Sequence, residues 1–196
     1  MFDLDRFVEA CRGSLGEGDS LGALREVVAR EVADPARVIA GLGRPERGGV
    51  ECLYQSPDLT VLNVVWAPYM TIMPHNHNMW AVIGVYGGRE DNIFWSRIAG
   101  DAGATIEAAG ARSIGAGTAT PLGPDIIHSV TNPTMKLTAG LHLYGGDFLV
   151  SPRSEWEPET LQESPFTMDE SQRLFEEANL RAEAVPHARP SPLPTA

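Results

Sequence analysis

The chain has 196 residues, 43% of them hydrophobic, which suits one domain with a sizeable core, and its net charge of −11 disfavours nucleic acids and anionic membranes as partners. No apolar run is long enough to cross a bilayer, and the N-terminus lacks the basic and apolar regions of a signal peptide. Two cysteines, Cys11 and Cys52, are too few for a disulfide framework, so we expect a cytoplasmic protein.

Residues 1–46 are predicted to form helices that pack on the following domain. Their apolar side chains recur with helical spacing. A second helix is predicted to begin where Asp19 and Ser20 can cap its N-terminus. A third is predicted to begin where Asp34 caps and Pro35 takes the first helical position. Glycines and a proline then end this helical segment.

Residues 47–150 change to short β-rich segments separated by Gly, Pro, Asp and Asn. The clearest predicted strands are Leu59–Trp66, Met70–Pro74, Met79–Tyr86, Asn92–Arg97, Arg112–Ile114, Ile126–Val130 and Leu137–Tyr144. No helix-length apolar pattern interrupts them. Many short strands with this spacing indicate a mainly β sandwich or barrel rather than a sheet built from βαβ units.

Residues 151–196 are predicted to form a C-terminal extension with one helix and a loose tail. The stretch Thr167–Glu170 has the pattern of a capping box, and Leu174, Phe175 and Leu180 follow on one side of the predicted helix. From Val185 onward the chain has four prolines and little apolar content, so this part, which includes His187, is expected to be the tail.

Three histidines in the β-rich segment form a candidate metal site. His75 and His77 stand as an H-x-H pair between two apolar runs, and His128 lies on a later run. On a strand, alternation directs both imidazoles of such a pair to one face, and another strand can supply the third. Neutral imidazole is the commonest metal ligand, and a facial set leaves open positions for redox or Lewis-acid chemistry. Structural or solvated histidines are the alternative.

Motif by motif, the β-rich segment resembles the cupin superfamily, which is built on a double-stranded β-helix. The first cupin motif centres on H-x-H and ends in a glycine after the next strand, here Gly88. The second motif contains glycines, a proline, a histidine and an asparagine, which match Gly115, Pro121, Gly123, His128 and Asn132. The resemblance implies a mainly β cupin jelly-roll barrel at residues 47–150, with N-terminal helices and a C-terminal helix.

One departure from the cupin pattern changes the implied ligand set. Most cupins carry a glutamate ligand a few residues after H-x-H, but residues 78–82 contain no carboxylate. The resemblance therefore implies a site of three histidines without an acid, with Glu90 and Asp125 as alternative ligands. Three neutral ligands leave the metal charge uncompensated, which favours an anionic co-ligand such as a thiolate.

A three-histidine cupin is similar to the thiol dioxygenases, the family of cysteine dioxygenase and 3-mercaptopropionate dioxygenase. The family places a Ser-x-His-x-Tyr triad beside its iron. His142 and Tyr144 match the last two members, whereas Gly140 stands at the serine position. The resemblance implies iron(II), with Ni or Zn as alternatives, and gives His142 and Tyr144 catalytic roles. A core histidine and ordinary aromatic packing are the alternatives for these two residues.

The expected substrate anchor of this family is missing. Cysteine dioxygenase holds its substrate carboxylate with an arginine on an early strand, but the corresponding residues 51–56 contain none. A bidentate arginine–carboxylate pair is geometrically specific, so its absence argues against cysteine as substrate unless Arg89, Arg97 or Arg153 reaches in from elsewhere. A thiol without a carboxylate, or a different small molecule, fits this pattern.

The leading functional hypothesis is an iron(II)-dependent, thiol-dioxygenase-like oxidoreductase that adds dioxygen to a small thiol and releases a sulfinate. The first alternative is a non-redox cupin with Zn or Ni that binds or senses a small molecule, or acts as an isomerase or hydrolase. A third is a cupin whose metal only stabilises the barrel. Cupins often form homodimers, although the sequence shows no interface.

Overall fold

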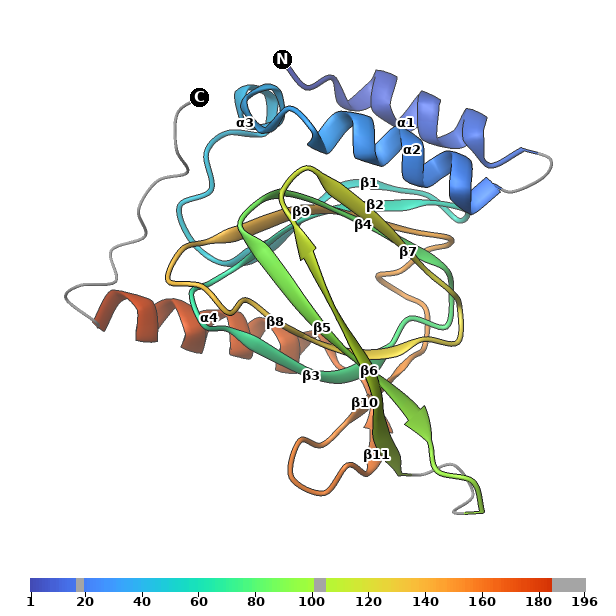
Figure 1. Cartoon of the computed structure of the whole chain (residues 1–196), viewed down its shortest axis with the longest axis vertical. Helices are drawn as coiled ribbons and strands as arrows, with labels where there is room; N and C mark the ends of the chain where they lie inside the picture. The colour runs from blue at the N-terminus through green and yellow to red at the C-terminus, as the bar shows by residue number, and fades with distance from the viewer. Residues whose placement is uncertain (17–19, 101–104, 185–196) are drawn as a thin grey trace.

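The computed structural model describes residues 1–16, 20–100 and 105–184. Two antiparallel β-sheets face each other, with helices at both ends of the chain (Figure 1). The predicted mainly β double-stranded β-helix with N-terminal helices and a C-terminal helix is confirmed. The proposed cap at Asp19 and the tail from Val185 with His187 lie outside the described residues.

The first sheet contains five strands in the order β1-β2-β9-β4-β7. These are β1 (Gly49–Gln55), β2 (Thr60–Trp66), β9 (Thr138–Tyr144), β4 (Ala81–Gly87) and β7 (Thr118–Leu122). The second sheet contains six strands in the order β11-β10-β3-β8-β5-β6. These are β11 (Glu163–Pro165), β10 (Ser154–Trp156), β3 (Thr71–Asn76), β8 (Ile127–Thr131), β5 (Arg89–Arg97) and β6 (Ile106–Gly115).

All seven predicted strands are present, but β1, β7, β10 and β11 were not predicted. Strand β1 lies at the edge of its sheet and is partly exposed, so it lacks a clear apolar pattern. Strand β7 is short and contains Pro121, and β10 and β11 span only three residues each. Strands of this kind give a weak sequence signal because proline and short length both argue against a strand.

The helices are α1 (Leu4–Ser14), α2 (Ser20–Val32), α3 (Pro35–Leu42) and α4 (Met168–Ala184). The predicted cap of α3 is confirmed, since the Asp34 side chain accepts a hydrogen bond from the backbone N–H of Arg37. At α4, the hydroxyl of Thr167 accepts from the backbone N–H of Glu170 at 3.3 Å, as in a capping box. Among the described residues, none of these helices has the length and apolar character needed to cross a membrane.

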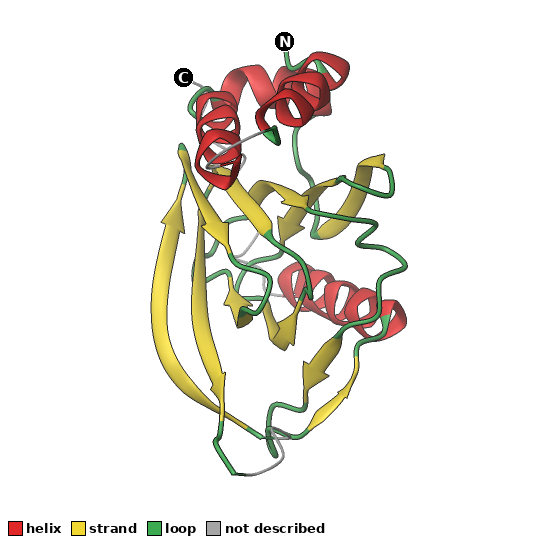
Figure 2. Ribbon diagram, turned by 90° about the vertical axis from the view of Figure 1, so that its right-hand side faces the viewer, coloured by secondary structure: helices red, strands yellow, loops and turns green. Residues whose placement is uncertain are grey.

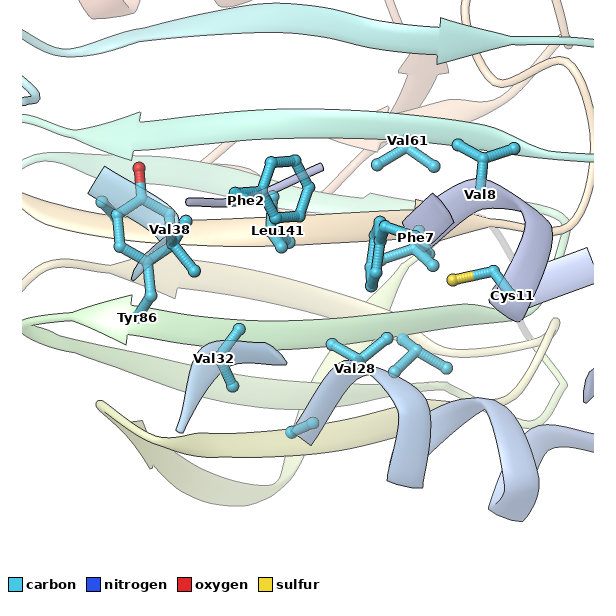
Figure 3. Close-up of a cluster of buried hydrophobic side chains, with 14 of the residues drawn as sticks. Phe2, Phe7, Val8, Cys11, Val28, Val32, Val38, Val61, Tyr86 and Leu141 are labelled. Atoms are coloured by element: carbon cyan, nitrogen blue, oxygen red, sulfur yellow. The ribbon is translucent and has the colours of Figure 1, made fainter. Parts of the chain in front are cut away.

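Two apolar cores lie on opposite faces of the first sheet. The outer core fills the space between this sheet and helices α1–α3 and includes Val28, Val32 and Leu141 (Figure 3). The inner core lies between the two sheets and includes Ile83. Helix α4 lies apart from α1–α3 and contributes Phe175 to the inner core (Figure 2). Because both faces of β4 are covered, the whole strand is buried.

A glycine on β4 allows α2 to approach the sheet closely. A Cβ atom added at Gly84 would lie 2.4 Å from a methyl carbon of Val28 and 3.0 Å from one of Val32. We therefore expect Gly84→Ala to lower the free energy of unfolding by about 1–3 kcal/mol, as overpacked core variants do. Urea unfolding measures this loss. The matched control is Gly110→Ala on β6, where an added Cβ meets no atom within 4 Å, and an equal loss in both variants would contradict the packing argument.

Candidate metal centre

The structure brings the three predicted histidines together. His75 lies on β3 directly opposite His128 on β8, and His77 follows one residue after the end of β3. One potential ligand atom from each histidine lies within 4.8 Å of the others. The Nε2 atoms of His77 and His128 are 3.1 Å apart. Strand pairing across the second sheet thus places three imidazoles at one point in the buried interior.

Hydrogen bonds orient two of these rings. The Nδ1 atom of His75 lies 3.0 Å from the backbone oxygen of Met73, and Nδ1 of His128 lies 2.6 Å from the side-chain oxygen of Asn92. Oxygen atoms of carbonyl and amide groups only accept, so both Nδ1 atoms carry the hydrogen. Each Nε2 atom then presents its lone pair to the centre, which is the arrangement that metal-binding histidines have.

The environment keeps all three imidazoles neutral. Burial lowers the pKa of His75 to about 4, against an opposing effect of its hydrogen bond to Met73. Burial, followed by the neighbouring histidines, holds the pKa of His77 and of His128 well below the usual value. Neutral imidazole is the form that binds a metal. Among the described residues, the buried Nδ1 atom of His77 has no hydrogen-bond partner. The close approach of the three rings and their neutral state together fit a divalent transition metal.

Neither alternative ligand joins the histidines. Asp125 is exposed and lines a separate cleft together with Arg97. Glu90 is buried but contacts Trp66 and His142 instead. Within the described chain, the group that could hold a metal ion therefore consists of three histidines without a carboxylate, as the departure from the cupin glutamate predicts.

A small cavity of about 50 Å³ adjoins the three histidines. Most of its wall is apolar, and its polar lining includes His142, Tyr144 and Arg153. Such a cavity, with few polar groups converging on one point, is typical of a binding site for a small molecule.

Alternation along β9 directs His142 and Tyr144 into this cavity. Leu141 and Leu143 belong to the outer core beneath the helices, so the residues between and after them face inward. The Nδ1 atom of His142 lies 3.4 Å from the Tyr144 hydroxyl. The Tyr144 ring packs edge-on against His77, with 5.0 Å between ring centroids. Burial raises the pKa of Tyr144, so its hydroxyl keeps its hydrogen and is available as a donor.

One arginine reaches the cavity from outside the early strands. Arg153 is 7% exposed, and its guanidinium lies 3.9 Å from the ring centre of Phe148 and 4.1 Å from that of Phe166. It donates to the backbone oxygens of Phe148 and Ser151 and contacts the sulfur of Met168, while its buried Nε atom has no partner. A buried cation without a paired carboxylate can bind an anionic group of a ligand.

The other two arginines considered from the sequence do not line the cavity. Arg89 forms an ion pair with Asp91 at 3.0 Å, and Arg97 pairs with Glu163 at 2.5 Å. The segment from β9 to β10 thus supplies the cationic group that the early strands lack.

Near the metal centre lies a buried polar group around Glu90, which the sequence suggested only as an alternative metal ligand. Glu90 on β5 is fully buried and accepts hydrogen bonds from Trp66 at 2.9 Å and Asn92 at 3.0 Å. Burial would raise the pKa of Glu90, but His142 and these two donors lower it below the usual value, so the carboxylate is ionised. In the sequence, Glu90 stands in a run of four polar residues, 89–92, directly after two glycines, so no local pattern marks it as buried.

No family model matches this chain, and no curated protein matches it. Among solved structures it is similar to an uncharacterised conserved protein with a double-stranded β-helix domain from Klebsiella pneumoniae, with a TM-score of 0.43, 14% identity, and coverage of 56% of this chain and 82% of the other. For a Cupin 2 conserved barrel domain protein from Salinispora arenicola, the TM-score is 0.39 and the identity 19%, and the match covers 52% of this chain and 77% of the other. For oxalate oxidase in complex with glycolate, the TM-score is 0.39 and the identity 16%, and the match covers 53% of each chain.

These similarities are low, and the chemistry that the site can perform follows from its own geometry. Fold and site together define a double-stranded β-helix protein, the architecture of cupins, in which three neutral histidines form a candidate metal centre.

Proposed function

We propose that this protein is an iron(II)-dependent, thiol-dioxygenase-like oxidoreductase that acts on a small thiol carrying an anionic group. One observation carries the proposal: a single small cavity combines three neutral histidines, a tyrosine hydroxyl and a buried arginine whose Nε atom has no hydrogen-bond partner among the described residues. Bound iron(II) supplies redox chemistry to the reaction, in which both atoms of dioxygen add to the thiolate sulfur and give a sulfinate.

The ligand set supports an anionic sulfur ligand. His75, His77 and His128 would hold the metal through neutral nitrogen atoms, so the positive charge of a divalent ion is not compensated by the protein. A thiolate therefore binds more favourably at such a site than at one that already contains a carboxylate ligand.

Arg153 supports a substrate with a second anionic group. Its guanidinium is held between two aromatic rings, and its free Nε–H can donate to a carboxylate in the cavity. This position replaces the missing arginine of the early strands, so the expectation of a thiol without a carboxylate is revised. The cavity volume of about 50 Å³ favours a short molecule.

Tyr144 is proposed to donate a hydrogen bond to the reacting group, with its hydroxyl held near His142. We expect Tyr144→Phe to retain metal while kcat falls about 10-fold or more, because one charge-assisted hydrogen bond contributes roughly 1.5–3 kcal/mol. Steady-state oxygen uptake and metal analysis measure both quantities. The control is Tyr54→Phe, whose hydroxyl accepts from Arg12 on the surface, and an unchanged kcat in Tyr144→Phe would remove Tyr144 from the reaction.

The experiment that tests the proposal is anaerobic metal analysis followed by oxygen uptake on iron-reconstituted protein. The thiols are 3-mercaptopropionate, cysteine and cysteamine, of which only the first two carry a carboxylate. Uptake of one dioxygen per thiol, with a sulfinate product and preference for a carboxylate-bearing thiol, is the expected result. Tight iron binding with no uptake on any thiol would refute the thiol substrate.

The same ligand set favours one second candidate. Three histidines with open positions also suit zinc-dependent hydrolysis or isomerisation. Purified protein that contains zinc and shows no oxygen chemistry would support that non-redox function instead.

A further inference from the structure

We propose that Glu90 is a positioning residue that aligns both the candidate metal ligand His128 and the Tyr144 hydroxyl. The inference rests on the proposed function for the role of Tyr144, whereas its metal-binding part stands on the histidine geometry alone. Glu90 touches neither group directly. It acts through Asn92 on one side and through His142 on the other.

The first arm runs from Glu90 to the metal centre. Asn92 Nδ2 donates to Glu90 Oε1 at 3.0 Å, and the opposite end of the same amide, Oδ1, lies 2.6 Å from Nδ1 of His128. A carboxylate can only accept, so it determines which end of the Asn92 amide faces it. The oxygen is then turned to His128, whose Nδ1 carries the hydrogen and whose Nε2 lone pair points to the other histidines.

The second arm runs from Glu90 to the cavity. Oε2 of Glu90 accepts from Trp66 Nε1 at 2.9 Å and lies 3.4 Å from Nε2 of His142. An anionic oxygen beside Nε2 favours the hydrogen at that atom. Nδ1 of His142 is then an acceptor, and it lies 3.4 Å from the Tyr144 hydroxyl. The imidazole ring thus holds the tyrosine oxygen at one place in the cavity.

Gly140 stands where the thiol dioxygenases have serine, so this position offers His142 no hydroxyl, and Glu90 lies beside His142 in its place. A Cβ atom added at Gly140 would lie 3.3 Å from Nε2 of His142 and 3.0 Å from the backbone oxygen of Gly84. The space beside the ring on that side is therefore nearly filled by backbone. In this chain the polar partner of His142 comes from β5, across the interior, rather than from β9.

The first test is Glu90→Gln, with Co²⁺ as the metal probe. An amide at this position presents a donor where Trp66 and Asn92 already donate, so Asn92 is expected to turn and offer its Nδ2 to His128. The hydrogen of His128 then moves to Nε2, the atom that would bind the metal. We expect Co²⁺ affinity to fall about 10- to 100-fold, as measured by absorbance titration, because partners of metal-binding histidines have effects of this size.

Two further variants control this result. Asp91→Asn makes the same chemical change one residue away, where the carboxylate pairs with Arg89 and Ser113, and it should leave Co²⁺ affinity unchanged. Glu90→Gln combined with Asn92→Asp exchanges donor and acceptor: the new amide donates to the new carboxylate, which still accepts from His128. The double variant should recover most of the lost affinity, and it also provides a testable protein if the single variant does not fold.

The second arm has its own measurement on iron-loaded protein at saturating metal. Glu90→Gln should lower kcat for the thiol that the wild-type protein oxidises. The KM for this thiol should change little, because Arg153 still holds the anionic group of the substrate. The double variant should restore kcat only in part, since its carboxylate lies at residue 92, beside His128, and no longer at residue 90, beside His142.

The outcomes separate this inference from the proposed function. If Co²⁺ affinity is unchanged in Glu90→Gln, or is not recovered in a folded double variant, the inference that Glu90 aligns His128 is overturned. An unchanged kcat at saturating metal would overturn the alignment of Tyr144. Weakened and recovered Co²⁺ binding in a protein that oxidises no thiol would support the metal arm while refuting the thiol chemistry itself.

Discussion

Replacing His128 with alanine is expected to abolish tight metal binding while both sheets remain folded. The side chain supplies one of three nitrogen atoms that lie within 4.8 Å of one another, and two remaining histidines leave an incomplete facial set. Metal at about 100 times its dissociation constant stabilises the wild-type fold by about 2.7 kcal/mol, and the variant should lose this stabilisation. Thermal unfolding with and without Co²⁺ and direct metal analysis measure both effects.

The matched control for His128 is Asp125→Asn. Asp125 lies three residues earlier, is exposed, and lines a different cleft, so its variant should bind metal as the wild type does. Circular dichroism of metal-free His128→Ala checks that the sheets persist. Full metal content in folded His128→Ala would overturn the ligand assignment, and an equal loss in Asp125→Asn would show that the effect is not local.

Replacing Arg153 with methionine is expected to raise KM for 3-mercaptopropionate by about 10- to 100-fold. Hydrogen bonds to charged groups contribute roughly 1.5–3 kcal/mol, and tenfold corresponds to about 1.4 kcal/mol. Methionine keeps an unbranched apolar chain between Phe148 and Phe166, so the aromatic contacts and the fold should survive. The measurement is kcat/KM for 3-mercaptopropionate against that for cysteamine, which has no carboxylate to lose.

Two comparisons make the Arg153 result specific. Arg89→Met removes an arginine that is paired on the surface and should leave both thiols unaffected. Arg153→Lys keeps the charge but loses the planar guanidinium with its Nε–H donor, so the KM of this variant should lie between those of the wild type and the methionine variant. If kcat/KM decreases equally for 3-mercaptopropionate and cysteamine in Arg153→Met, a role of Arg153 in anion binding is excluded.

Local patterns were sufficient to predict the histidine group. The H-x-H pair at the end of β3 and the apolar run around His128 both mark strands, and pairing of β3 with β8 brings His75 opposite His128. Strand alternation places His142 and Tyr144 on one face of β9. These features depend on residues close in sequence or on neighbouring strands, which is why periodicity alone reveals them.

The partners of these residues could not be predicted in the same way. Glu90 reaches Trp66 and His142 only because two sheets face each other, and nothing in the sequence spacing gives that distance. Arg153 lies in a segment after β9 whose course is set by Phe148 and Phe166. Contacts across the barrel interior depend on the tertiary fold, so the sequence suggested Glu90 only as an alternative metal ligand and Arg153 only as one of three alternative substrate anchors.

Strand β9 separates the two cores, and neighbouring positions along it therefore face different selective pressures. Leu141 and Leu143 point to the helices, so changes there alter how much folded protein a cell accumulates. His142 and Tyr144 point to the cavity, so changes there alter what each folded molecule does. Within one seven-residue strand, abundance and specific activity can thus diverge independently, and lineages can acquire a new substrate without rebuilding the helical layer.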